Sequence, residues 1–281
     1  MSEMNNSQKT LETIWRIPDA LWIKLKPILN KYDPPSRTGR KRINARAALD
    51  AIIFRLRSGC QWNQLPHEFP DDSSVHRTFQ RWELNGVLDQ IWATLVEECE
   101  QLGGVDWQWQ SADAAMAKAR FGGDETGPNP TDRAKPGTKR SVLVEIDGGP
   151  LAVVIGGANV HDCKLLEATL DAIVVERPNP QNVEQHLCLD KGYDNPTGRD
   201  AASKHNYIPH IRRIGEEKLN KQQQKRYPAR RWVVERTLGW LSKCRAILVR
   251  YDKKASNYLG MIKLACALLW YRRCWRLSNV N

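Results

Sequence analysis

The sequence lacks the features that mark secreted, disulfide-stapled and membrane-spanning proteins. Its seven cysteines are odd in number, scattered and without a Cys-x-x-Cys pair, which argues against a disulfide framework and a zinc module. The opening MSEMNNSQKT has no apolar signal core. The longest apolar stretch, YLGMIKLACALLWY at 258–271, contains Lys263 and is too short to span a bilayer. We therefore expect a protein of a reducing cytosol, with 258–271 as a core helix.

No residue type dominates the composition, which excludes collagen-like, fibrous and disordered chains. The 281 residues suffice for two domains, and 41% of them are hydrophobic, enough for real cores. Acids are in deficit, because 32 Asp and Glu face 43 Lys and Arg, a net charge of +11. Residues 212–254 hold fourteen Lys or Arg against four acids. This clustered surplus favours a nucleic-acid partner over a merely solvated basic surface.

The first part of the chain, 1–102, is predicted to form an all-helical domain. Apolar residues recur there at helical spacing. The predicted helices cover 18–29, 43–59, 71–86 and 87–102.

The helix predicted over 71–86 has an apolar stripe and a basic outer side. Val75, Phe79 and Trp82 share one face, which leaves Arg77 and Arg81 on the outside. Short helices with such an outer face are typical of helix-turn-helix-like DNA readers. A plain helical bundle whose exposed side is basic fits the pattern equally well, and the sequence leaves both readings open.

The second part, 105–281, alternates between strand and helix patterns. Strands are predicted at 106–113, 141–147, 151–157, 184–190 and 207–211, and helices at 163–176, 198–206 and 255–275. A long helix or a helix pair is predicted over 228–249. The glycine- and proline-rich segment between the first two strands is predicted to be a loop, and Gly148-Gly149-Pro150 to turn a hairpin. This order predicts a mixed α/β sheet with helices on its faces.

Three acids of this second part stand where strands or helices could bring them together. Asp113 is predicted to close the first strand and Asp190 the fourth, so the two lie side by side if these strands are neighbours. Glu235 is the one acid on the helix RRWVVERTLGWLSKCRAIL and lies off its apolar face. Each also has an ordinary reading: a turn cap, the first residue of a turn, or the i+4 ion-pair partner of Arg231.

Three such carboxylates would need cations to remain together. Two unit charges 4 Å apart repel by about 4 kcal/mol at an effective dielectric constant near 20. Oxygen-only ligands select hard ions such as Mg²⁺ or Mn²⁺. Two of these ions can activate the attacking oxygen and stabilise the leaving oxygen in phosphoryl transfer. The pattern therefore favours metal-dependent chemistry on a phosphodiester.

Several long segments carry a resemblance to a known family. They are LRSGCQWNQLPHEFPDDSSVHRTFQRW, SADAAMAKA, GGDETGPNPTDRAKPGTKRSVLVEIDGGPLAVVIGGANVHD, CLDKGYDN and ARRWVVERTLGWLSKCRAILVRYDKKASNYLGMIKLACALLWYRR. Together they span most of the chain. The sequence resembles the insertion-sequence transposases of the DDE type, in the insertion-sequence-five family. The resemblance implies a ribonuclease-H-like catalytic core behind a helical DNA-binding domain.

The resemblance also assigns roles to individual residues. The metal-binding and catalytic acids would be Asp113, Asp190 and Glu235, holding two Mg²⁺ or Mn²⁺ ions. Related transposases carry a tyrosine–arginine–glutamate–lysine signature on the last helix, which is the helix of Glu235 here. Its nearest matches here are Tyr227, Arg231, Glu235 and Lys243, and both outer gaps are one residue longer than the pattern.

The implied function is that of an insertion-sequence DNA transposase. Such an enzyme binds the terminal inverted repeats, hydrolyses phosphodiesters at the element ends and transfers the freed strands into target DNA. The implied partner is double-stranded DNA, with a homodimer when DNA is bound. The implied location is the bacterial cytoplasm, in association with the nucleoid. The alternatives are a catalytically inactive DNA-binding regulator and a metal-dependent nuclease that does not join strands.

Overall fold

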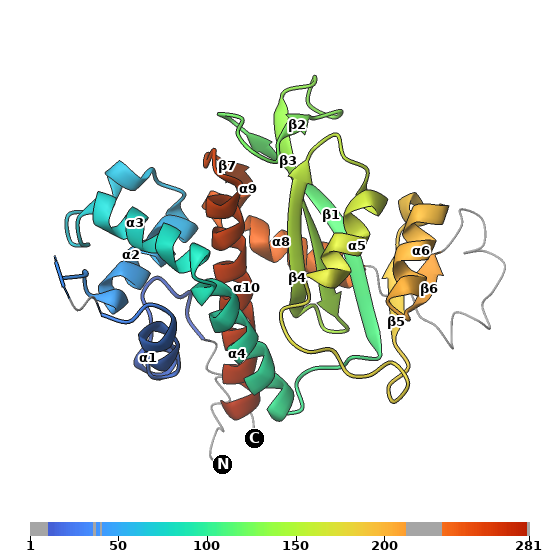
Figure 1. The fold of residues 1–281 in the computed structure, drawn as a ribbon, viewed down its shortest axis with the longest axis horizontal. Coiled ribbons are helices and arrows are strands. Elements are labelled where there is room, and N and C mark those ends of the chain that lie inside the picture. Colours follow the sequence, from blue (N-terminus) through green and yellow to red (C-terminus); the bar gives the residue numbers. More distant parts are fainter. Residues whose placement is uncertain (1–10, 36–37, 40, 212–231, 280–281) are drawn as a thin grey trace, which may run out of the picture.

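The computed structural model describes residues 11–35, 38–39, 41–211 and 232–279. Helices from the first part of the chain lie to one side of a mixed sheet, and the long last helix runs between them (Figure 1). The helices of the first part are α1 (Asp19–Tyr32), α2 (Ala45–Ser58), α3 (Asp72–Leu84) and α4 (Val87–Gln101), with a short 3-10 turn at Trp62–Gln64. The all-helical character predicted for this region is confirmed.

Side chains and glycines at the ends of these helices explain where they begin and stop. The Asn44 side chain caps α2 by accepting a hydrogen bond from the Ala47 amide at 3.0 Å. Gly59 ends α2 in the left-handed region, with φ of 68°. A tight turn through Gly86, also left-handed at φ 71°, joins α3 to α4. The link between α2 and α3 is longer and contains the 3-10 turn.

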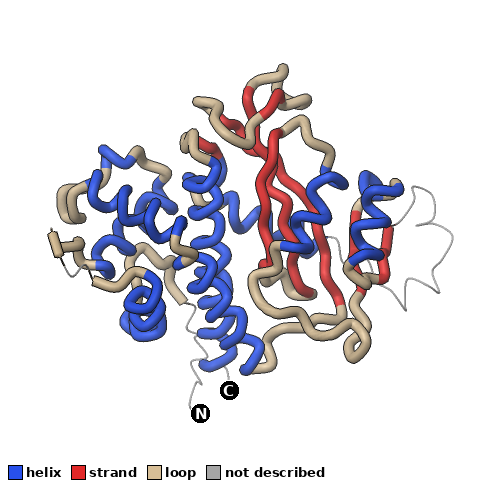
Figure 2. Tube along the Cα trace, viewed as in Figure 1, coloured by secondary structure: helices blue, strands red, loops and turns tan. Residues whose placement is uncertain are grey.

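The sheet combines antiparallel and parallel pairing, as tube and ribbon views show (Figures 1 and 2). Its strands are β1 (Trp109–Ala119), β2 (Gly127–Pro128), β3 (Pro136–Glu145), β4 (Pro150–Gly157), β5 (His186–Leu189), β6 (Ile208–Ile211) and β7 (Val249–Arg250). The order is β2-β3-β1-β5-β6, with β4 also on β3 and β7 on β1. β1, β3 and β4 pair antiparallel, whereas β5 pairs parallel with both β1 and β6.

Helices cover both faces of the sheet. They are α5 (Asp162–Asp171), α6 (Pro196–Lys204), α8 (Trp232–Ser242), α9 (Arg245–Leu248) and α10 (Ala255–Asn279). On β3, Ser141 accepts a 2.8 Å hydrogen bond from Thr169 of α5, whereas its neighbour Arg140 donates to Ser242 of α8 at 2.5 Å. Because adjacent strand residues face opposite ways, α5 and α8 lie on opposite faces. The mixed α/β sheet flanked by helices is thus confirmed.

Several predicted boundaries are wrong. Strand β1 does not end at Asp113 but runs on to Ala119, because it pairs with β3 as far as Lys118. Helix α5 ends at Asp171, since the segment after it turns back and the Val174 amide donates to the Leu151 carbonyl at 3.0 Å. Residues 228–249, for which a long helix or a helix pair was predicted, do contain the pair α8 and α9, and residues 228–231 lie outside the described part of the chain.

Helix α10 joins the helical region to the sheet. Toward the helices, the Lys263 ammonium contacts carboxylates of Glu83 and Asp89, both at 2.8 Å. Toward the sheet, the Trp270 ring nitrogen donates to the Pro150 carbonyl at 2.6 Å, and Arg273 pairs with buried Glu145 at 2.5 Å. The buried residues form one continuous core. The division into domains at 1–102 and 105–281 stays a prediction, and the core-helix prediction for 258–271 is confirmed.

Within the described ranges, none of the helices combines the length and apolar character that crossing a bilayer requires.

Candidate active site on the sheet face under α8

The strand register places two of the predicted acids beside each other. Ser111 of β1 is the parallel partner of Cys188 of β5. Asp113 lies two residues beyond that pair within β1, and Asp190 lies two residues beyond it, as the first residue after β5. Because paired strands are about 4.8 Å apart, we expect the two side chains to lie near each other. The predicted adjacency depended on these strands being neighbours, and they are.

The face that carries these acids is the one covered by α8. Asp113 pairs with Val142 across the β1–β3 ladder, and Val142 is two residues from Arg140. Arg140 donates to Ser242 of α8. Since residues two apart share a face, Asp113 points to the α8 side of the sheet. The Asp190 carboxylate accepts the Gly192 amide at 2.5 Å, which fixes the turn after β5.

Helix α8 carries Glu235 to roughly the same level. Ser242, near its end, reaches Arg140, whose strand partner is Ala115. Near its start, Thr237 donates to the Gly148 carbonyl at 2.7 Å in the β3–β4 turn. The helix therefore runs in the direction of β1. Glu235 lies two turns before Ser242, on the same side and about 10 Å back along the axis. That distance corresponds to about three strand residues, a level close to Asp113.

The donor chemistry fits a hard divalent cation, although the side chains are not gathered into a closed cluster. Carboxylate oxygens are the ligands that Mg²⁺ and Mn²⁺ prefer. Asp113 and Asp190 are half-buried, whereas Glu235 is exposed. Among the described residues, no group of three His, Cys, Asp or Glu side chains is close enough together to hold a metal ion. The structure thus brings two acids together and places the third on the facing helix.

Tyr193 is a neighbour of both acids that the sequence did not single out. It is fully buried in the turn after β5, and its hydroxyl has no hydrogen-bond partner in the described part of the chain. Burial, and then the charges of Asp113, Asp162 and Asp190, raise the pKa of Tyr193 well above that of a free phenol. The signal in the sequence was its place in the run Lys191-Gly192-Tyr193 directly after Asp190.

The residues predicted to contact DNA differ in exposure and in the contacts that they already make. Lys243 is exposed just after α8, and Arg77 is exposed on α3. Arg81 instead holds Asp33 through two hydrogen bonds, from Nε at 2.9 Å and from a terminal nitrogen at 3.0 Å. Its guanidinium thereby ties α3 to the end of α1. Tyr227 and Arg231 lie outside the described residues.

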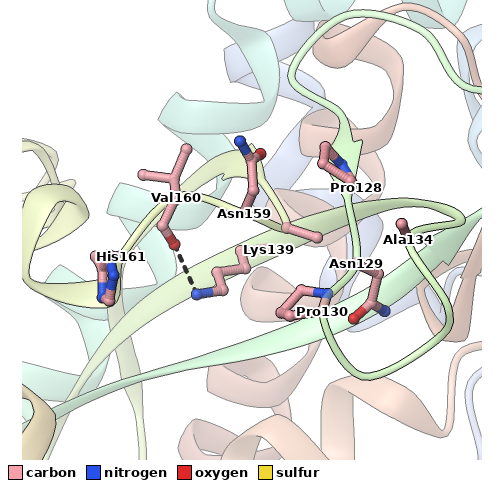
Figure 3. Close-up of a pocket in the computed structure, with 9 residues that line it drawn as sticks. Pro128, Asn129, Pro130, Ala134, Lys139, Asn159, Val160 and His161 are labelled. Atoms are coloured by element: carbon pink, nitrogen blue, oxygen red, sulfur yellow. Dashed lines mark hydrogen bonds between the residues drawn. The ribbon is translucent and has the colours of Figure 1, made fainter.

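One cavity lies on the opposite face of the sheet. It has a volume of about 450 Å³ and is bordered by Pro128, Asn129, Lys139 and His161 (Figure 3). Lys139 is engaged there, because its ammonium donates to the Val160 carbonyl and to Asp162, both at 2.6 Å. As Lys139 shares the α5 face with Ser141, this cavity is not the site of the paired acids.

A larger groove of about 720 Å³ separates the helical region from the far end of β1. His76 lines it, stacked on Trp62 with ring centroids 4.5 Å apart. Burial, followed by the charge of Arg55, lowers the pKa of His76, while Asp252 opposes the shift. The Asn257 side-chain nitrogen lies 3.2 Å from Nε2 of the ring. A neutral ring accepts that amide hydrogen, and a protonated ring does not.

We expect His76 to make folding sensitive to mild acid. Because its pKa is lower in the folded than in the unfolded chain, the unfolded chain binds a proton first as pH falls below 6.5. The free energy of unfolding should therefore fall between about pH 7 and pH 5. The His76→Gln variant should lose less over that interval in urea titrations than the wild type. Equal losses in both proteins would contradict the assignment.

Comparison with known proteins identifies the family. Residues 94–270, more than half of the chain, match the family described as "Transposase DDE domain". Residues 17–92 match a family described as "Putative transposase of IS4/5 family". This chain belongs to the DDE transposases, the family that its sequence resembles.

Individual relatives point to a particular kind of DDE transposase. A protein of Burkholderia cepacia named "Putative transposase for insertion sequence element IS402" is 36% identical over 162 residues, covering 56% of this chain and 71% of the relative. A second B. cepacia protein, "Insertion element IS402 uncharacterized 16.2 kDa protein", is 30% identical over 118 residues, covering 41% of this chain and 80% of the relative. The chain is a transposase of an insertion sequence.

Solved structures are more distant. The catalytic domain of Mos1 mariner transposase shares 12% identity with a TM-score of 0.27, and the comparison covers 76% of this chain and 98% of that domain. The Mos1 paired-end complex with Mn shares 11% identity with a TM-score of 0.28, covering 94% of this chain and 89% of that one.

Proposed function

We propose that this transposase cuts DNA at the ends of its insertion sequence and joins the freed strands to target DNA. Asp113, Asp190 and Glu235 would be the acids that perform this chemistry. The observation that supports the proposal is the register of β1 and β5, which pairs Ser111 with Cys188, two residues before Asp113 and Asp190 in each case. Paired carboxylates have this placement in a site for phosphodiester chemistry.

The acids would hold two divalent cations, Mg²⁺ or Mn²⁺. Such ions supply Lewis-acid polarisation of the phosphodiester and lower the pKa of a water molecule. The protein's part is to keep the two aspartates charged and oriented. The Gly192 amide holds the Asp190 carboxylate in place, and the Ala114 amide donates to Asp113 at 2.8 Å. Glu235, on the helix that faces the sheet, would complete the ligand set.

The reaction would take place in two transfers. A water oxygen attacks the phosphodiester at the element end, the P–O bond to the 3′ oxygen breaks, and a 3′ hydroxyl is released. That hydroxyl then attacks a phosphodiester of target DNA and displaces its 3′ oxygen, so no covalent protein intermediate forms. Lys243, with Arg231 and Tyr227, would contact phosphates near the scissile bond.

The helical region would recognise the terminal inverted repeats. Arg77 lies exposed on α3 and is available to DNA, whereas Arg81 would have to leave Asp33 to contribute. Because an element has two ends that must be brought together, we propose that the DNA-bound form is a homodimer. Each chain would then act on one end.

Strand transfer with labelled ends tests the proposal. The inverted repeats in the DNA flanking the gene supply the end sequences, and a plasmid supplies the target. We expect joined products with Mg²⁺ and none in EDTA. Cleavage without joining would identify a nuclease, and binding of the ends without cleavage would identify a regulator. Either outcome would overturn the proposal.

A further inference from the structure

The groove between the helical region and the sheet has features of a binding site that is separate from the three predicted catalytic acids. It lies between α3 and β7, at the far end of β1 (Figure 1). Phe121 lies two residues past the end of β1, and Asp113 lies six strand residues before that end, about 20 Å at the rise of an extended strand. The groove is therefore distinct from the candidate active site, though the same strand leads from one to the other.

Two aromatic side chains stand exposed at the edge of this groove. Phe121 is 60% exposed and Tyr251 is 43% exposed, although both are large apolar groups. Their ring centroids are 5.9 Å apart. The backbone beneath them is fixed, because the Arg120 amide donates to the Arg250 carbonyl at 3.0 Å. The two ring planes are inclined at 59°, so a planar group can stack on one ring while the other ring borders its edge.

The floor of the groove presents unused hydrogen-bond donors. Arg55 is only 4% exposed, and one of its terminal nitrogens binds both carboxylate oxygens of Asp252 at 2.9 and 3.0 Å. Its Nε and other terminal nitrogen have no hydrogen-bond partner within the described residues. Trp62 covers the guanidinium, with the carbon of that group 4.3 Å from the ring centroid. Buried N–H groups without an acceptor cost free energy, so a ligand that places an acceptor group against Arg55 would be stabilised there.

The charge distribution separates the floor of the groove from its rim. Arg55 is neutralised by Asp252, and Asp72 adds a further acid to the lining. A phosphate would meet repulsion there. Outside the groove, Lys253 and Lys254 are exposed on the segment after β7. The floor thus suits a neutral planar group with donors and acceptors at its edge, and the rim suits a polyanion.

We propose that this groove takes a nucleobase turned out of the stack of the bound DNA, in an extension that rests on the proposed function. The base stacks on one of the two rings, Phe121 or Tyr251, and the other ring borders it. Its polar edge meets the donors of Arg55 and the carboxylate of Asp72. Lys253 and Lys254 contact the flanking phosphates. Stacking platforms beside basic surfaces are how proteins hold single-stranded or distorted DNA. The groove would therefore hold the DNA strand about 20 Å from Asp113.

A comparison of two strands of equal charge tests this assignment. One probe is a fluorescein-labelled thymidine strand about twelve nucleotides long, within the span that such surfaces hold. The other has the same length but consists of abasic sites. Fluorescence anisotropy measures the affinity of full-length protein for each. We expect the wild type to bind the thymidine strand about tenfold more tightly, since one stacked base contributes that much.

The variants isolate the groove from the general charge of the protein. In the double variant Phe121→Ala with Tyr251→Ala, the affinity for the thymidine strand divided by the affinity for the abasic strand should fall close to one. The affinity for the abasic strand itself should stay unchanged. Arg55→Lys keeps a cation beside Asp252 but removes the two idle donors, so it should lower the preference as well. Trp15→Ala, which alters an aromatic residue 46% exposed outside the groove, should keep the full preference. Melting curves check that each variant is folded.

Two results would overturn the assignment. One is a wild type that binds both strands equally, and the other is an unchanged preference in the Phe121/Tyr251 double variant. Neither result bears on the acids, because strand transfer is measured separately with complete element ends. Conversely, a chain that fails in strand transfer yet shows the groove-dependent preference would overturn the proposed function and support the groove.

Discussion

Asp190→Asn is expected to reduce cleavage of end-containing DNA by about a thousandfold or more, the scale on which loss of a central catalytic group acts. Asparagine keeps the shape of the side chain, and its amide oxygen can still accept the Gly192 amide that Asp190 now binds at 2.5 Å. It removes the negative charge, on which the binding of hard cations depends. The loss should therefore fall on chemistry and leave folding intact. The measurement is the rate of release of a labelled strand in Mg²⁺.

Asp194→Asn is the matched control for this variant. Asp194 lies in the same turn, but its carboxylate pairs with Arg199 of α6 at 2.6 Å. We expect the control to cleave at close to the wild-type rate, and both variants to bind end-containing DNA in EDTA as the wild type does. Wild-type cleavage by Asp190→Asn would remove this residue from the site and leave the paired-acid interpretation without support.

Lys263→Met is expected to lower the free energy of unfolding by about 3 kcal/mol, because it leaves a buried acid without its partner. The Glu83 side chain is only 8% exposed and contacts the Lys263 ammonium at 2.8 Å. Burial already raises the pKa of Glu83 despite that lysine. Without it, Glu83 must either take up a proton or remain charged in an apolar setting. Urea unfolding followed by circular dichroism measures the change.

Two further variants separate this effect from a general loss of lysine. Lys204→Met removes a cation from an exposed pair with Glu167, in which the side chains are 67% and 47% exposed, and should leave the free energy of unfolding close to that of the wild type. Combining Lys263→Met with Glu83→Leu should restore most of the lost stability, since replacing both partners of a buried pair is often nearly neutral. A double variant no more stable than Lys263→Met would argue against the buried charge as the cause.

Some parts of the fold follow directly from local sequence. The Asn44 cap and the left-handed Gly59 delimit α2, and both are readable from residue type alone. The buried run before Asp190 predicts a strand that ends there, and β5 does. The pairing of β5 with β1 is a contact between residues 77 positions apart. No local pattern encodes it, and the expectation came from resemblance to a family.

Other parts could not be read from sequence because tertiary contacts override local preference. The segment following Asp113, AAMAKA, consists mostly of residues that favour helix, yet it continues β1 because β3 pairs with it. Arg81 was placed on an outer, DNA-facing surface by helical periodicity, but Asp33 from a distant helix meets it there. Tyr193 and the groove of Arg55 and Phe121 were missed, since what makes them notable is burial and neighbours from remote segments.

The position of α10 bears on how copies of such a gene decay. Its buried residues complete the packing of α3 and α4 on one side and of β4 on the other. A copy with a premature stop codon before residue 255 would encode neither a stable helical fragment nor a stable sheet. Its product would be cleared by proteases and would not compete with intact transposase for the element ends. Truncated copies of the gene would thus yield no product that inhibits transposition of intact copies.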